Sequence, residues 1–190
     1  MKSNRIKTFL LTGLIVVGGC MLQFSVFASE FVIRDASSKL LGDIYVISAD
    51  IDYQFSEVAL EALENGVPLL VDVHVQVRRE GAWIWEKDVV DRHFQKQIRY
   101  LPLSATYEVI TQSGSKKTQF ISRQAALSAL GSIDEYPVVK ASDLEKDETY
   151  EMEIKTELDI EALPVPLRPR AYMSPDWKLS SEWSQWLLKP

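Results

Sequence analysis

Hydrophobic and polar positions alternate along most of the chain after residue 29. In residues 45–55 and 69–77 the odd positions are hydrophobic, and most of the residues between them are polar. In residues 150–160 the hydrophobic residues, together with Thr156, occupy the even positions instead. Successive side chains of a strand point to opposite faces, so this pattern predicts strands with one buried and one solvated face, as in antiparallel sheets. We expect the hydrophobic positions of all three segments to face the core.

Shorter segments with the same character predict further strands. They lie at residues 31–39, 83–85, 93–101, 106–112 and 116–121. Gly42-Asp43, Glu80-Gly81 and Ser113-Gly114 supply turn residues between neighbouring segments, because glycine adopts positive φ without steric cost. Pro102 ends the strand that precedes it, since proline has no N–H for a ladder hydrogen bond.

Two short helices are predicted between the strands. The first is capped by Ser56 and ended by Gly66, and the second is capped by Ser122 and ended by Gly131. A serine oxygen accepts a hydrogen bond from the free N–H groups of the first turn, and glycine suits the position after the last turn. The prolines of residues 164–169 predict an extended stretch, and the tail after them is expected to pack as a strand or short helix.

These elements together predict the fold class. We expect a mainly β protein: an antiparallel β-sandwich, with the immunoglobulin-like arrangement as one form of it, and two short α-helices.

The N-terminal segment departs from this pattern. Three basic residues precede an uncharged stretch at residues 8–29, and Val26-Phe27-Ala28 ends in a small side chain. A basic start, a hydrophobic run and a small residue at the cleavage position are the features of an export signal. We predict that residues 1–28 are a signal peptide cleaved after Ala28, and that residues 29–190 form a single β-rich domain in the periplasm.

Two other fates of the leader stay open. Residues 8–29 are long enough to span a bilayer with the basic end in the cytoplasm, which would anchor the protein in the inner membrane. Val17-Gly18-Gly19-Cys20 resembles a weak lipoprotein box, so lipid could attach to Cys20. We expect membrane contact only if the leader is retained or Cys20 is lipidated.

Cysteine and charge narrow the possible chemistry. Cys20 is the only cysteine, so the cleaved domain would contain neither a disulfide nor a cysteine nucleophile. The leader holds three of the 21 basic residues and none of the 27 acidic ones, so residues 29–190 carry a formal charge of −9. An acidic domain repels phosphates, and we expect no nucleic-acid partner.

Known cofactor and nucleophile motifs are absent. The five glycines after residue 28 are widely spaced, and the chain contains no G-x-G-x-x-G, P-loop or G-x-S-x-G sequence. We therefore expect no cofactor, no catalytic residue and no enzymatic activity.

The two histidines, His74 and His93, lie far apart in the sequence. A metal site would need Asp72 and His74 on one strand face together with carboxylates from elsewhere. A solvated strand face is the simpler interpretation, and we expect no metal site. Asp91-Arg92-His93 could be a fragment of a catalytic triad, but neighbours along a strand point to opposite faces, so we expect a solvated loop there.

Several carboxylates share strand faces. They are Asp50 with Asp52, and Glu151 with Glu153 and Glu157. A glycosidase needs two carboxyl groups about 5–9 Å apart across a cleft. These rows lie on the polar faces of amphipathic strands, so we expect them to be solvated.

Tryptophan is the remaining candidate for a functional surface. Trp83 and Trp85 alternate along one short segment, and Trp177, Trp183 and Trp186 lie within the last 14 residues. A buried tryptophan usually belongs to the core, whereas exposed tryptophan clusters commonly anchor binding partners. These five residues form the candidate interaction surface.

A set of short segments suggests a family. They are Glu61–Leu69, Trp83–Trp85, Arg99–Leu101, Tyr107–Val109, Ala126-Leu127, Leu130-Gly131, Leu163-Pro164, Pro166-Leu167, Asp176–Leu179, Ser181–Trp183 and Trp186. In order and spacing they resemble a family of secreted bacterial proteins called domain of unknown function 4390. The resemblance implies no catalytic residues, because the family is uncharacterised. Its genes are often neighbours of sensor-kinase genes, which implies by association a periplasmic accessory of a membrane sensor in a Gram-negative bacterium.

Two hypotheses of function follow. The first is an exported, non-enzymatic binding or accessory domain with a protein partner at the cell envelope, such as a sensor kinase. The alternative is a hydrolase or carrier that acts on envelope glycans or lipids. A cleft with a carboxylate pair, or an apolar cavity, would favour the alternative.

Overall fold

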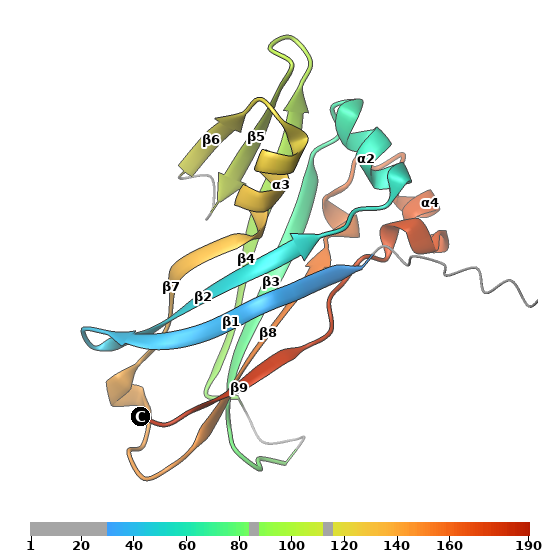
Figure 1. Ribbon diagram of the computed structural model, residues 1–190. Coiled ribbons are helices and arrows are strands. Elements are labelled where there is room, and N and C mark those ends of the chain that lie inside the picture. The colour runs from blue at the N-terminus through green and yellow to red at the C-terminus, as the bar shows by residue number, and fades with distance from the viewer. Residues whose placement is uncertain (1–29, 84–87, 112–115) are drawn as a thin grey trace, which may run out of the picture.

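Two antiparallel sheets make up most of the protein (Figure 1). The computed structural model describes residues 30–83, 88–111 and 116–190. In this part of the chain one sheet has the strand order β1-β2-β7, and the other has the order β6-β5-β4-β3-β8-β9. The predicted mainly antiparallel β fold is confirmed.

The strands match most of the predicted segments. They are β1 (Phe31–Leu41), β2 (Ile44–Tyr53), β3 (Leu69–Arg79), β4 (Val90–Leu101), β5 (Thr106–Thr111), β6 (Lys116–Phe120), β7 (Ser132–Lys140), β8 (Tyr150–Leu158) and β9 (Ser184–Leu188). The tail prediction is therefore met by β9, which pairs with β8. Trp83 follows the turn after β3 and is not in a strand, and the rest of that predicted segment lies outside the described residues.

Strand β7 was not predicted from the sequence. It contains Pro137, and its register against β2 shifts twice, so its hydrophobic positions do not alternate regularly. Proline is tolerated because β7 is the outer strand of its sheet, where one row of N–H groups has no ladder partner.

Three short α-helices lie in the described part of the chain. They are α2 (Glu57–Glu64), α3 (Arg123–Gly131) and α4 (Arg168–Met173). Ser56 and Ser122 cap the first two, as predicted, by accepting from Ala59 N and Ala125 N. The third helix corrects the expectation of an extended proline-rich stretch, because Pro169 occupies the first turn of α4, where no N–H group is needed.

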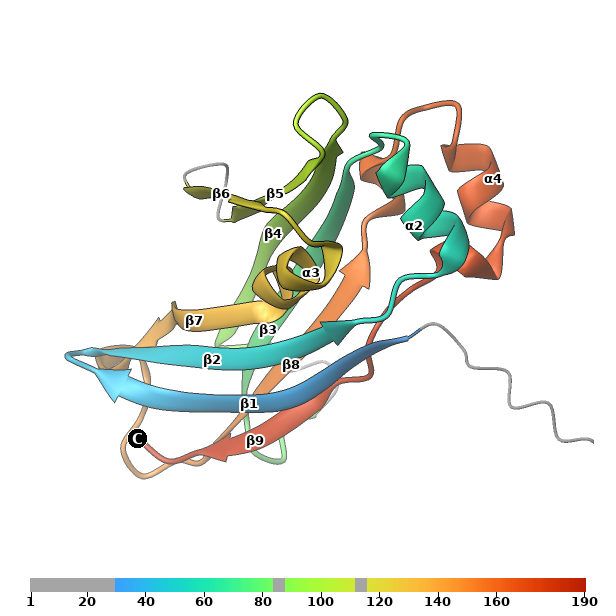
Figure 2. The same cartoon turned by 45° about the horizontal axis from the view of Figure 1, so that its top comes forward.

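The hydrophobic faces of the two sheets form one core. The odd positions of β2 and β3 and the even positions of β8 point into it, as predicted, and Val71, Val73 and Ile154 are fully buried. Figure 2 shows the three-stranded sheet lying across one face of the six-stranded sheet, with α2 and α4 together beyond the end of β2. The other face of the six-stranded sheet is therefore free to carry polar groups.

A buried polar contact between two side chains joins the sheets. The Tyr53 hydroxyl on β2 lies 3.1 Å from Thr156 Oγ1 on β8, and this oxygen donates to the backbone carbonyl of Asp72 at 2.9 Å. Tyr53 therefore donates to Thr156, and burial raises the pKa of the tyrosine hydroxyl. These hydrogen bonds connect β2 of the three-stranded sheet, through Thr156 of β8, to the backbone of Asp72 in β3.

No helix among the described residues is both long and hydrophobic enough to cross a bilayer. The predicted leader, with Cys20 and the cleavage position after Ala28, lies outside the described residues.

Candidate functional site

Two Asp-x-His sequences meet on the outer face of the six-stranded sheet. One is Asp72-Val73-His74 on β3, and the other is Asp91-Arg92-His93 on β4. The strands pair in antiparallel register with His74 directly opposite His93. Val73 points into the core, so its neighbours Asp72 and His74 project from the opposite face of the sheet. Asp91 and His93 of β4 project from the same outer face, because His93 pairs with His74.

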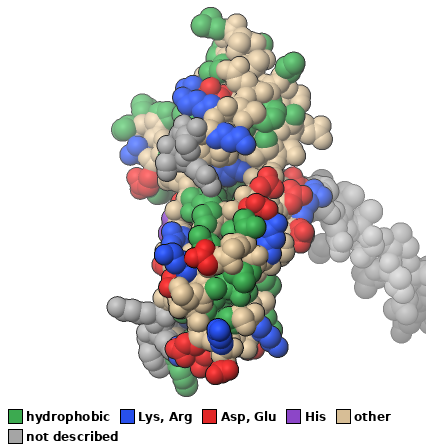
Figure 3. Space-filling view, turned by 90° about the vertical axis from the view of Figure 1, so that its left-hand side faces the viewer, with side chains coloured by type: hydrophobic (Ala, Val, Ile, Leu, Met, Phe, Trp, Pro, Cys, Tyr) green, Lys and Arg blue, Asp and Glu red, His purple; other side chains and the backbone are tan. Residues whose placement is uncertain are grey.

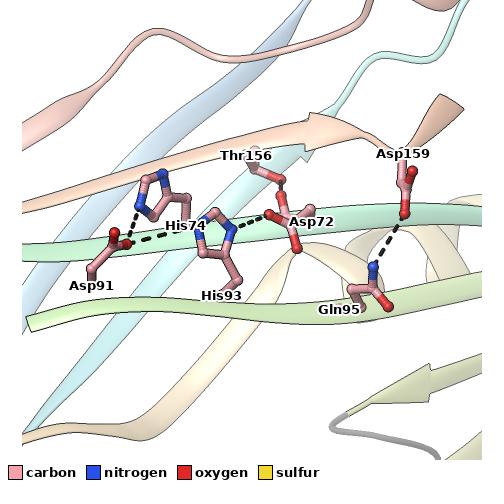
Figure 4. A network of polar contacts seen from close by, with 7 residues as sticks. All are labelled: Asp72, His74, Asp91, His93, Gln95, Thr156 and Asp159. Carbon is pink, nitrogen blue, oxygen red and sulfur yellow. Dashed lines mark hydrogen bonds and ion pairs between the residues drawn. The ribbon is translucent and has the colours of Figure 1, made fainter. Parts of the chain in front are cut away.

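The antiparallel register places each aspartate beside the histidine of the other strand (Figure 4). Asp91 Oδ1 lies 2.6 Å from His74 Nε2 and 3.7 Å from His93 Nε2. Asp72 Oδ2 lies 2.6 Å from His93 Nδ1. The two imidazole rings stack with their centroids 3.9 Å apart and their planes inclined by 20°. We call these four residues the His–Asp cluster.

The His–Asp cluster corrects one expectation from the sequence and adds a relation that the sequence did not show. Asp91-Arg92-His93 lies in strand β4 rather than in a solvated loop. The two histidines, distant in the sequence, are cross-strand neighbours. A repeated Asp-x-His on two neighbouring antiparallel strands is the signal that could have suggested this arrangement.

The surroundings of the His–Asp cluster are partly open. The His74 side chain is 22% exposed, and those of Asp91 and His93 are 54% and 53% exposed. Trp183 approaches His74 edge-on, with ring centroids 5.0 Å apart, and Lys155 Nζ lies 6.0 Å from the Trp183 ring centroid. A small ion can therefore reach the cluster from solvent.

The chemistry of the His–Asp cluster suits ligation better than nucleophilic catalysis. Imidazole nitrogens and carboxylate oxygens are common ligands of divalent transition cations. In the described part of the chain, the hydrogen bonds and ion pairs of both rings go to Asp72 and Asp91, and none goes to a hydroxyl group. The contact between nucleophile and base that defines a Ser-His-Asp hydrolase is not formed there.

A second candidate site consists of two neighbouring hollows between β4 and β7, which together we call the groove. Its larger part has a volume of about 630 Å³ and lies among β4, β5, β6, α3 and β7. Its smaller part, about 490 Å³, lies between β7 and the first residues of β4. Phe94 of β4 and Tyr136 of β7 line the larger part, and their rings are in stacking contact with centroids 4.0 Å apart. Figure 3 shows the side of the molecule that carries β6 and β7, where hydrophobic side chains gather at mid-height between basic and acidic ones.

Unpaired strand edges border this groove. Strand β5 pairs with β4 only from Lys96 to Leu101, so residues 90–95 of β4 have a strand neighbour on one side alone among the described residues. Strand β7 is the last of its sheet, and its outer edge is likewise unpaired within the described chain. Two rows of backbone hydrogen-bonding groups are thus available beside one groove.

Lys96 is buried at the wall of the larger part of the groove. Its Nζ donates to the carbonyl oxygens of Ser132 at 2.7 Å and Ala129 at 3.2 Å, at the C-terminal end of α3, where the helix dipole favours a cation. Burial lowers the pKa of Lys96 to about 8, while the nearby Asp134 acts in the opposite direction.

This burial predicts a pH dependence of stability. Because the pKa of Lys96 is lower in the folded protein, burial of the protonated amine reduces the free energy of unfolding at pH values below about 8. As pH rises from there towards the ordinary lysine pKa of about 10.4, the unfolded chain stays protonated while the folded one does not, so stability rises. Relative to Lys96→Met, the wild-type protein should gain roughly 2 kcal/mol of unfolding free energy between pH 8 and pH 10.

Urea denaturation of both proteins at several pH values measures this difference, in which the titration of all other groups cancels. An unchanged difference across the window would show that Lys96 stays charged in the folded protein.

The five candidate tryptophans do not form one surface in the described part of the chain. Trp83 is 68% exposed, and Trp183 lies at the His–Asp cluster. Trp177 is buried in the core, and Trp186 is half-buried and donates from Nε1 to Ser38 Oγ at 2.9 Å. Trp85 lies outside the described residues. The sequence alone could not separate these roles, because it does not show which faces are covered.

The acidic rows are split in a similar way. Asp50 is exposed, as expected, and Asp52 forms an ion pair with Arg34 at 2.6 Å, whose hydrogen bond lowers the pKa of the carboxyl group. Glu153 is covered instead: it accepts from Gln185 at 2.7 Å, and burial raises its pKa. The side chains of Asp52 and Glu153 therefore make structural contacts within the protein.

Comparison with known proteins gives one match. A family model described as Domain of unknown function (DUF4390) matches residues 28–187 of the 190-residue chain. No curated protein and no solved structure matches the chain.

Proposed function

The chain belongs to the DUF4390 family, as its short segments suggested, and from this premise we propose that it is an exported, non-enzymatic binding domain of the cell envelope. Its partner is an extended segment of another protein, which lies in the groove between β4 and β7. The observation that carries the proposal is the pair of unpaired strand edges beside this groove.

Unpaired edges favour an extended partner because they offer main-chain hydrogen bonds in the pattern that another strand uses. Peptides commonly add to exposed sheet edges, where main-chain bonds supply affinity and pockets for alternate side chains supply specificity. The stacked rings of Phe94 and Tyr136 provide an aromatic contact for such side chains. We therefore expect the partner segment to alternate hydrophobic and polar residues.

Charge sets the expected orientation of the segment. The larger part of the groove is lined by Lys96 and Lys116 against one carboxylate, Asp134, within a chain that is acidic overall. We therefore expect an acidic residue of the partner at this end. A membrane sensor that exposes such a segment outside the cytoplasm is the partner class that the family resemblance suggests.

Site-specific photo-crosslinking tests the proposal. A photoreactive residue at Lys140, an exposed position that lines the smaller part of the groove, is compared with one at Lys178, an exposed lysine outside both parts of the groove. We expect crosslinks from position 140 to one extended segment of an envelope protein, and few from position 178. Protein recovered from the periplasmic fraction should begin at Ser29.

A synthetic peptide of the crosslinked segment provides the decisive measurement. It should bind the purified protein and slow backbone amide hydrogen exchange in residues 90–95 and 132–140. Binding that protects other strands, or equal crosslinking from both positions, would contradict the proposal.

A carrier of an amphiphilic ligand is the second candidate. The larger part of the groove lies in the size range of small-molecule sites, and Val109, Phe120 and Ile133 contribute apolar surface to it. A lipid that co-purifies with the protein and competes with the peptide would favour this alternative. The larger part of the groove does not offer the carboxylate pair of a glycosidase, because Asp134 is the single carboxylate among the described residues that line it.

A further inference from the structure

The His–Asp cluster lies on the outer face of the six-stranded sheet, and its chemistry does not depend on the proposed function of the groove. We propose that His74 Nε2, His93 Nε2 and a carboxylate oxygen of Asp91 bind one divalent transition-metal cation of the zinc class. The ligand atoms of these three residues already lie within 4.8 Å of one another.

The distances are close to those of a metal site. Zinc binds histidine nitrogen at about 2.0–2.1 Å and carboxylate oxygen at about 2.0–2.2 Å, which places tetrahedral ligands about 3.4 Å apart. His93 Nε2 and Asp91 Oδ1 are 3.7 Å apart. His74 Nε2 and Asp91 Oδ1, at 2.6 Å, need to separate by less than about 1 Å. Rotation of the half-exposed Asp91 side chain supplies this movement. The stacked His74 and His93 rings also have to tilt, because a bound cation lies near the plane of each imidazole.

Asp72 orients one of the proposed ligands, His93. Its Oδ2 lies 2.6 Å from His93 Nδ1, the ring nitrogen that is not a proposed ligand. Metal-binding histidines almost always donate their other ring N–H to a carboxylate or carbonyl, which fixes the tautomer and the ring orientation. With the proton on Nδ1, the lone pair of His93 Nε2 faces Asp91. Asp72 is therefore a positioning residue, held in place through the Thr156 hydrogen bond to its backbone carbonyl.

Charge and access fit a divalent cation. Two carboxylates beside two imidazoles leave a local negative charge that the cation neutralises. Three protein ligands leave a fourth position open to water or to a partner's side chain, as in open zinc sites. Imidazole favours zinc, copper and nickel over magnesium and calcium, which prefer oxygen ligands.

The variants available on this sheet face allow a matched comparison. Asp91→Asn and His93→Gln alter proposed ligands, and Asp72→Asn alters the positioning residue without touching the metal. Glu157→Gln is the control. Glu157 is the exposed cross-strand neighbour of Asp72 on β8, and its substitution makes the same change from a carboxylate to an amide. Near-UV circular dichroism checks that each variant is folded.

Isothermal titration of the tag-free, chelator-treated protein with zinc chloride tests the proposal. We expect one cation per chain and no saturable heat with magnesium chloride. Affinity should fall at least tenfold in Asp91→Asn and His93→Gln, fall tenfold to 100-fold in Asp72→Asn, and stay within about twofold of wild type in Glu157→Gln.

Tryptophan fluorescence gives a second readout, because Trp183 is 5.0 Å from the His74 ring. Copper(II) should quench part of the emission at one equivalent, and Trp183→Phe should remove that part. Absence of saturable zinc binding, or equal affinity in Glu157→Gln, Asp72→Asn and His93→Gln, would overturn the proposal.

Discussion

Replacing Gly131 with alanine is expected to destabilise the protein by about 3 kcal/mol, because the added methyl group has no space. A Cβ atom at this position would lie 1.9 Å from the carbonyl oxygen of Ile51 in β2, so the end of α3 would have to move away from the sheet. The sequence assigned Gly131 to the end of the helix. The structure adds that the backbone of α3 at Gly131 lies too close to β2 for a side chain at this position.

Gly42→Ala is the matched control for this variant. Gly42 has open space around it but a φ of +66°, so alanine there should cost only about 1 kcal/mol of backbone strain. Urea denaturation of both variants measures the difference in unfolding free energy. An equal loss of unfolding free energy in the two variants would contradict the prediction, because it would show that α3 moves away from β2 with little loss of stability. The Gly131 variant should also weaken the hydrogen bonds of Lys96, since their acceptors flank the end of α3.

Replacing Phe31 with alanine is expected to cost about 3–5 kcal/mol, the range for a buried phenylalanine. The Phe31 ring is 1% exposed and packs edge-on against Tyr53 at 4.7 Å and against Phe55 at 5.2 Å. These contacts attach the first residue of β1 to the end of β2 and the residues that follow it. Phe31 lies three residues after the predicted cleavage position at Ala28, so its ring anchors the start of the predicted domain.

Val32→Ala is the natural control, because Val32 is adjacent in β1 and 40% exposed. Its substitution should change the unfolding free energy by less than about 0.5 kcal/mol. The comparison is made by thermal and urea denaturation of both variants. A small effect of Phe31→Ala would mean that Tyr53 and Phe55 collapse into the space, and that β1 is held mainly by its ladder with β2.

The sequence predicted only part of the two candidate sites. Alternation in residues 69–77 correctly placed Asp72 and His74 on the outer face of β3. It could not show that His93 would lie opposite His74, because that depends on the register between two strands separated by a turn. The groove depends on β7, whose irregular register left no periodic signal.

The sequence by itself determined which faces of β2, β3 and β8 are buried and where α2 and α3 begin. Both properties are local, since they follow from the two-residue period of a strand and from the residues at a helix terminus. The tertiary structure alone decided that Trp177 is buried while Trp183 reaches the His–Asp cluster, and that the edges of β4 and β7 stay unpaired beside a groove. These properties depend on which strands pair and in which register. Hydrophobic periodicity excludes a slip of one residue, but it does not show which strands pair or distinguish registers that differ by two residues.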